Sequence, residues 1–124
     1  MRTTGLCVMV LCGVAAAAQP DTSRYQACAD RLMKAINAGD YEAIEHEYNS
    51  QMRVALPIEK TRAFFSQLTA QLGSLKELGK LHWEADSLAV FQTTFERATL
   101  DMKLSLDDAG KIAGLLFVPS KSSP

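Results

Sequence analysis

The sequence predicts an α+β domain in which three N-terminal helices pack on a four-stranded antiparallel sheet. From about residue 21 to Gly73, apolar residues recur every three or four positions, which is the period of a helix. After Gly73 they alternate with polar residues, which is the period of a strand. The strands follow one another with short turns between them, so an antiparallel meander is expected behind a separate helical half.

The first two predicted helices meet at a glycine and an aspartate. The segment 21–38 places apolar residues at helical spacing and ends before Gly39, whose freedom to adopt positive φ suits a helix end. Asp40 can cap the second helix with its carboxylate. The apolar face of that second helix is expected to contain Tyr41, Ile44, Tyr48 and Met52.

The third predicted helix begins at Pro57, which has no N–H to lose in a first helical turn, and is closed by Gly73. Four strands are expected after it, at about 80–84, 88–96, 98–106 and 111–118. The last of them is apolar on both faces, which predicts a strand that is central or covered on both sides. A glycine-containing turn over 107–110 separates the last two strands.

The first 18 residues are expected to be a signal peptide and not part of the fold. Arg2 supplies a positive start, Gly5–Val14 is apolar, and the small residues Ala15–Ala18 lead to a cleavage site before Gln19. We therefore expect a secreted or periplasmic protein with a single domain over 19–118 and a disordered tail over 119–124. No later segment is apolar enough to act as an anchor, so no membrane association is expected after cleavage.

Composition narrows the classes of partner. The chain has 124 residues, of which 48% are hydrophobic and 22% charged, with a formal net charge of −1. That balance gives no basic footprint for nucleic acid. Cys28 remains alone once Cys7 and Cys12 leave with the signal peptide, and its place on an apolar helix face predicts a buried thiol.

Several short segments together resemble a known family. They are Gly-Asp-Tyr-Glu-Ala at 39–43, Ala-Leu-Pro at 55–57, Lys-Thr-Arg-Ala-Phe-Phe at 60–65, Thr-Thr-Phe-Glu-Arg at 93–97 and Gly-Leu-Leu-Phe-Val-Pro at 114–119. The mature chain resembles a bacterial secreted domain of unknown function of the nuclear transport factor 2-like type. The resemblance implies a curved sheet wrapped on the helices around a cone-shaped cavity. Such domains often precede a secreted serine or α/β hydrolase, so a hydrolase on a separate chain is a candidate partner.

Catalytic and metal motifs are weak. The sequence has no Gly-x-Ser-x-Gly elbow and no Ser-x-x-Lys. His46-Glu47 begins like a zinc-binding helix, but Ser50 stands where the second histidine would be. We expect neither a metal nor another cofactor, and no catalytic residue is assigned.

The expected site is an apolar cavity between the third helix and the sheet. Apolar pockets with a few polar groups at the rim are the usual sites for small molecules. The ligand-binding residues predicted are Tyr41, Tyr48, Phe65, His82, Trp83, Phe91, Leu100 and Met102. The alternative is that the aromatic side chains fill this space and leave no pocket.

Three functions follow from this interpretation. The first is a non-catalytic binding or accessory domain for a small apolar molecule or a partner protein. The second is a small lyase or isomerase that uses an ionisable group in the cavity. The third is a structural module that forms a homodimer through its sheet. An ionisable group inside a closed cavity would favour the enzyme, and a purely apolar lining would favour binding.

Overall fold

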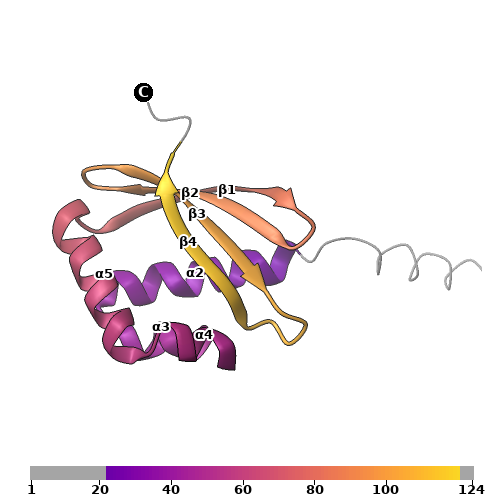
Figure 1. The fold of residues 1–124 in the computed structure, drawn as a ribbon. Coiled ribbons are helices and arrows are strands. Elements are labelled where there is room, and N and C mark those ends of the chain that lie inside the picture. The colour runs from indigo at the N-terminus through magenta and orange to yellow at the C-terminus, as the bar shows by residue number, and fades with distance from the viewer. Residues whose placement is uncertain (1–21, 121–124) are drawn as a thin grey trace, which may run out of the picture.

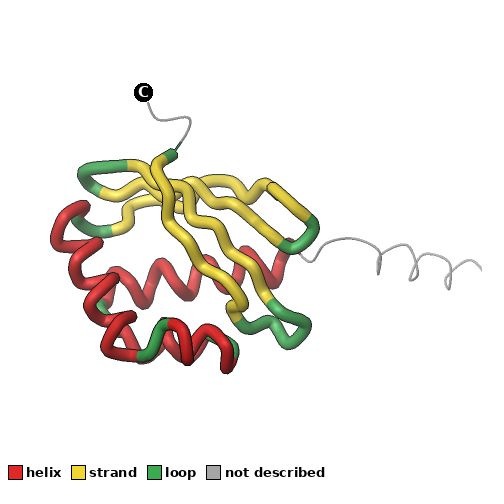
Figure 2. Tube along the Cα trace, viewed as in Figure 1, coloured by secondary structure: helices red, strands yellow, loops and turns green. Residues whose placement is uncertain are grey.

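The computed structural model describes residues 22–120 and shows an α+β domain with the helices on one side of an open antiparallel sheet (Figures 1 and 2). The signal peptide predicted at residues 1–18 lies outside the described residues. The elements are α2 (Thr22–Ala38), α3 (Tyr41–Glu47), α4 (Ser50–Ala55), α5 (Ile58–Leu72), β1 (Leu75–Ala85), β2 (Leu88–Phe95), β3 (Thr99–Leu106) and β4 (Ile112–Pro119). None of these helices is long and apolar enough to cross a bilayer.

The described part of the chain contains four helices, so the expectation of three was wrong. The second predicted helix is divided into α3 and α4 at Tyr48, which has extended backbone angles. Asn49 then caps α4, because its side-chain oxygen accepts the N–H of Met52 at 2.9 Å. The backbone N–H of Asn49 donates to the carbonyl of Ile112 at 2.9 Å, which ties the break to the start of β4.

The predicted helix ends are confirmed at two glycines and an aspartate. Gly39 and Gly73 have φ of +69° and +86°, and each directly follows the last residue of a helix. The carboxylate of Asp40 accepts the N–H of Ala43 at 3.2 Å, so Asp40 caps α3 as expected. These local signals set the geometry of the helical half.

The sheet has the order β1-β2-β3-β4, with every neighbouring pair antiparallel. β4 is therefore an edge strand, and the prediction that it is central or covered on both sides was wrong. Leu116 in β4 is 56% exposed, whereas its neighbours Leu115 and Phe117 are half-buried on the helical side. Apolar residues occur on both faces of β4, and three of them, Leu115, Leu116 and Phe117, line a pocket described below.

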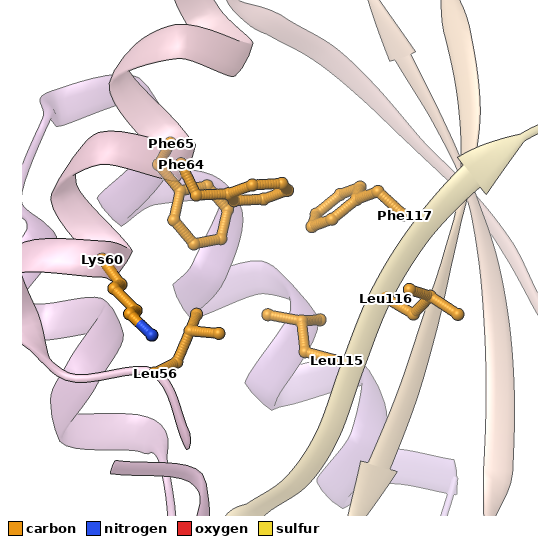
Figure 3. A pocket seen from close by; sticks show the side chains of 7 residues that line it. All are labelled: Leu56, Lys60, Phe64, Phe65, Leu115, Leu116 and Phe117. Atoms are coloured by element: carbon orange, nitrogen blue, oxygen red, sulfur yellow. The ribbon is translucent and has the colours of Figure 1, made fainter. Parts of the chain in front are cut away.

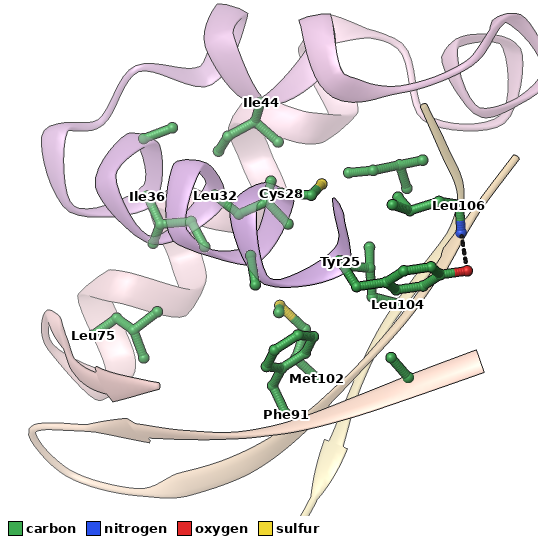
Figure 4. Close-up of a cluster of buried hydrophobic side chains, with 14 of the residues drawn as sticks. Tyr25, Cys28, Leu32, Ile36, Ile44, Leu75, Phe91, Met102, Leu104 and Leu106 are labelled. Atoms are coloured by element: carbon green, nitrogen blue, oxygen red, sulfur yellow. Dashed lines mark hydrogen bonds between the residues drawn. The ribbon is translucent and has the colours of Figure 1, made fainter. Parts of the chain in front are cut away.

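The hydrophobic core lies between α2 and the sheet (Figure 4). The expected face of α2 is buried, with Tyr25, Cys28, Leu32 and Ile36 each at most 7% exposed. The hydroxyl of Tyr25 accepts the N–H of Leu106 at 3.2 Å and donates to the carbonyl of Ser87 at 2.8 Å. The first described helix is thus fastened both to β3 and to the β1–β2 turn.

Asn37 joins the end of α2 to the start of β1. Its side-chain oxygen accepts the N–H of Leu75 at 2.8 Å, and its amide nitrogen donates to the carbonyl of Leu75 at 2.9 Å. One side chain therefore satisfies both backbone groups of Leu75, as a neighbouring strand would do.

The last strand extends one residue beyond its predicted end at residue 118. Pro119 is the last residue of β4, and Ser120 is 8% exposed. The hydroxyl of Ser120 accepts a hydrogen bond from the amide of Gln92 at 3.1 Å. Residues 121–124 lie outside the described residues.

Candidate functional site

An apolar pocket of about 360 Å³ lies between α5 and β4 (Figure 3). We call it the α5–β4 pocket, and it is lined by Leu56, Lys60, Phe64, Phe65, Leu115, Leu116 and Phe117. Its size falls at the lower end of the range of small-molecule sites in proteins, about 300–1,000 Å³. Six of its seven lining side chains are apolar, and Lys60 is the one that carries a charge.

The helical wall of the pocket follows from the spacing of its residues. Leu56, Lys60 and Phe64 are four residues apart, and Lys60 and Phe64 therefore lie on one face of α5. Leu56 lies at the end of α4, where its carbonyl accepts the hydroxyl of Thr61 at 3.1 Å. That bond holds the α4–α5 junction against the pocket.

The opposite wall is formed by β4. Leu115 and Phe117 pair with Leu104 and Met102 of β3, so they share the face of the sheet that the helices cover. Figure 3 shows both side chains pointing from β4 toward α5, with Leu116 on the other side of the strand. The pocket is therefore a space between α5 and the edge strand β4 that their side chains leave unfilled.

Three phenylalanines of the lining contact one another through their rings. The ring centroids of Phe64 and Phe65 are 4.9 Å apart with an interplanar angle of 85°. The ring centroid of Phe117 lies 6.0 Å from the centroid of each of these two rings. The contacts of Phe65 with the other two rings are edge-to-face, which favours one arrangement of the rings and gives this wall a defined shape.

Of the eight ligand-binding residues predicted from the sequence, Phe65 is the one that lines the α5–β4 pocket. Phe91 and Met102 are buried in the core beneath α2 (Figure 4). Leu100 is half-buried against that core. These three fill space between the layers of the domain. The pocket lies to the side of them, between α5 and β4.

Three of the predicted ligand-binding residues, Tyr41, Tyr48 and His82, have polar side chains and lie in three different places. Tyr48 is 1% exposed, and its hydroxyl lies 3.1 Å from the hydroxyl of Thr61. Burial raises the pKa of Tyr48, which keeps the phenol neutral. Tyr41 lines a polar hollow of about 260 Å³ together with Gly39 and Ser74.

His82 and Trp83 lie near the opposite edge of the sheet. They line a hollow of about 350 Å³ that also includes Asp101 and Lys103. The Trp83 ring makes an edge contact with Tyr25 at 4.8 Å between centroids. The structure therefore does not bring these residues together with Phe65.

The eight predicted residues do not include six of the lining residues: Leu56, Lys60, Phe64, Leu115, Leu116 and Phe117. Two signals were available for them. Lys60 stands four residues before Phe64 on the same helix, and the run Leu-Leu-Phe at 115–117 is more apolar than an edge strand needs.

Cys28 is the buried thiol that the sequence predicted, with 0% exposure. Its sulfur lies 3.8 Å from a carboxylate oxygen of Glu47, which Arg31 binds with two nitrogens at 2.9 Å each. Burial, and then the negative charge of Glu47, raises the pKa of Cys28 to about 12. A thiol held neutral in this way is a poor nucleophile.

Within residues 22–120, no three His, Cys, Asp or Glu side chains gather closely enough to hold a metal ion. The fold and the pocket together define an α+β domain with an apolar hollow beside its edge strand. Residues 29–115 match the family described as "Protein of unknown function (DUF3887)". This match covers more than half of the chain, and the chain belongs to that family. No curated protein and no solved structure matches the sequence of this chain.

Proposed function

We propose that this protein is a non-catalytic binding domain that holds a small apolar molecule in the α5–β4 pocket. The observation that carries the proposal is the pocket itself, a hollow of about 360 Å³ in which leucines and phenylalanines provide nearly all of the lining. Removing apolar ligand surface from water supplies roughly 25 cal/mol per Å², so such a lining favours apolar ligands.

The lining favours binding over the lyase or isomerase considered from the sequence. Acid–base catalysis needs ionisable groups within hydrogen-bond reach of the substrate, commonly with pKa values tuned by burial. The pocket offers the exposed Lys60 and no carboxylate, histidine or tyrosine among its lining residues. The ionisable residues among the predicted ligand-binding set, Tyr41, Tyr48 and His82, line other hollows or are buried.

We propose further that the domain is of the nuclear transport factor 2-like type and acts outside the cytoplasm. Helices on one face of the sheet and irregular register within β1–β2 and β3–β4 support a bent sheet of that type. The apolar run and small residues before Gln19 support export. The intact mass of exported protein is expected to match a chain that starts at or near Gln19, and retention of Met1 would contradict this.

A neutral, environment-sensitive dye such as N-phenyl-1-naphthylamine tests the pocket. We expect saturable one-to-one binding, and we expect Leu115→Trp to abolish it because the indole would occupy the hollow. Leu78→Trp is the matched control, since Leu78 is also half-buried against the core but lies in β1 at the far edge of the sheet. Dye fluorescence and thermal unfolding are measured for each variant.

A second variant keeps the test decisive if Leu115→Trp fails to fold. Phe64 is 42% exposed, so Phe64→Glu is expected to fold while placing a charge in the lining. Dye binding that survives both substitutions in folded protein would overturn the proposed site. Fluorescence of Trp83 is not the readout, because that residue lies with Tyr25 and does not line the pocket.

A further inference from the structure

We infer that the ligand of the α5–β4 pocket is a small apolar carboxylate, with its chain among the phenylalanines and leucines and its charged group at Lys60. The inference rests on the proposed function and adds the chemical class of the ligand. It is carried by the position of one ammonium group on an otherwise apolar lining.

Lys60 is placed to meet a charged group at the edge of the hollow. It lies one turn before Phe64 on α5, and Figure 3 shows its side chain extending toward Leu56 along the helical side of the pocket. Its methylene groups can cover apolar ligand surface while its ammonium group stays in water, as exposed lysines commonly do. A ligand with an anionic head and an apolar chain matches both parts.

The ammonium group of Lys60 is not engaged by other described residues. The ion pairs among residues 22–120 join Arg31 to Glu47, Lys76 to Glu96, and Lys103 to Glu84. Other lysines bind elsewhere, as Lys111 does when it donates to the carbonyl of His46 at 2.9 Å. Lys60 makes neither kind of contact within the described part of the chain, so an incoming carboxylate would not have to displace a partner.

The size and charge of the lining restrict the ligand further. A pocket of about 360 Å³ suits a short chain or a single ring and not a long lipid. No acidic residue lines it, so a cationic ligand of the same length would meet only like charge. A neutral alcohol would fill the apolar part and leave the ammonium group without a counter-charge.

Octanoate, octan-1-ol and octylammonium test the inference because they share one chain and differ in the head group. Binding to the mature protein is measured by isothermal titration calorimetry and by NMR shifts of leucine methyl groups, with Leu56 and Leu115 as reporters. Since Lys60 is exposed, we expect octanoate to bind about fivefold more tightly than octan-1-ol at low salt, and octylammonium to bind most weakly.

Lys60→Met is expected to abolish the preference for octanoate over octan-1-ol, because it removes the ammonium group and keeps an apolar side chain in the lining. Lys80→Met is the matched control, because it removes the same charge from an exposed residue of β1 at the opposite edge of the sheet. Equal binding of octanoate and octan-1-ol to the native protein, or a preference that survives Lys60→Met, would overturn the inference and leave the pocket itself in place. Failure of all three compounds to shift the methyl signals would overturn the proposed pocket function as well.

Discussion

Replacing Phe65 with alanine is expected to lower the free energy of unfolding by about 3–5 kcal/mol, the usual cost of removing a buried phenylalanine. Phe65 has 0% exposure and contacts both Phe64 and Phe117 through ring edges. The free energy of unfolding of a small domain is only about 5–15 kcal/mol in total, so the variant should unfold at a much lower urea concentration. Urea titration followed by circular dichroism measures the difference.

Phe64→Ala is the matched control for this change. It removes the same side chain from the next position, where the ring is 42% exposed, and should cost less than about 1.5 kcal/mol. Equal costs for the two substitutions would mean that Phe65 is not the residue that links α5 to the core. A large loss of stability for Phe65→Ala alone would show that Phe65 supports the fold, whereas Phe64 lines the accessible side of the pocket.

Alkaline pH is expected to destabilise the protein through Cys28. Burial holds the pKa of this thiol at about 12, above its ordinary value of 9.0, so both the folded and the unfolded chain keep the proton below pH 9. Between pH 9 and 12 the unfolded chain releases the proton and the folded chain does not. Stability therefore falls as pH rises, by about 1.4 kcal/mol per unit, or about 2 kcal/mol by pH 10.5.

Cys28→Ala isolates this effect from the other groups that titrate in the same range. Lysines and tyrosines, including Tyr48 with its raised pKa, contribute equally to both proteins. The difference in unfolding free energy between the native protein and the variant, measured in urea at pH 8 and at pH 10.5, should shrink by about 2 kcal/mol. A difference that is constant with pH would show that the thiol is not protected in the folded state.

Features set by neighbouring residues could be predicted from the sequence. Gly39, Asp40 and Gly73 fix helix ends through their own backbone preferences, and they lie where the sequence placed them. The alternation around Met102 and Leu104 also gave the correct buried face, because a strand's faces depend only on the pleat.

Features decided by distant residues could not be predicted. At the break between α3 and α4, the local cap by Asn49 is joined by a backbone bond to Ile112, far along the chain, and nothing within the helical segment signals that partner. The position of β4 at the edge depends on the order of strands and not on its composition. An apolar strand therefore suggested a central place, although its apolar residues face a pocket.

The candidate site was missed for a related reason. Phe91, Met102 and Phe65 are equally apolar in sequence, but α2 covers the first two and leaves space beside the third. In the sequence, Lys60 cannot be told from any other solvated lysine, because only the structure shows that Leu115 and Phe117 line the same pocket. A pocket is formed by the side chains of two elements together. The spacing of residues within one element predicts which of them form one wall, but it does not predict the space between the two walls.

The strand order has a consequence for the folding kinetics of the chain. Each strand pairs with its sequence neighbour, so the sheet can form from short hairpins whose loop closure costs little entropy. The contacts that enclose the most chain are those of α2, where Tyr25 bonds to Leu106 and Arg24 donates to the carbonyl of Asp108. Because ordering such long loops is the slow part of folding, the rate should be set by the docking of α2 on a preformed meander.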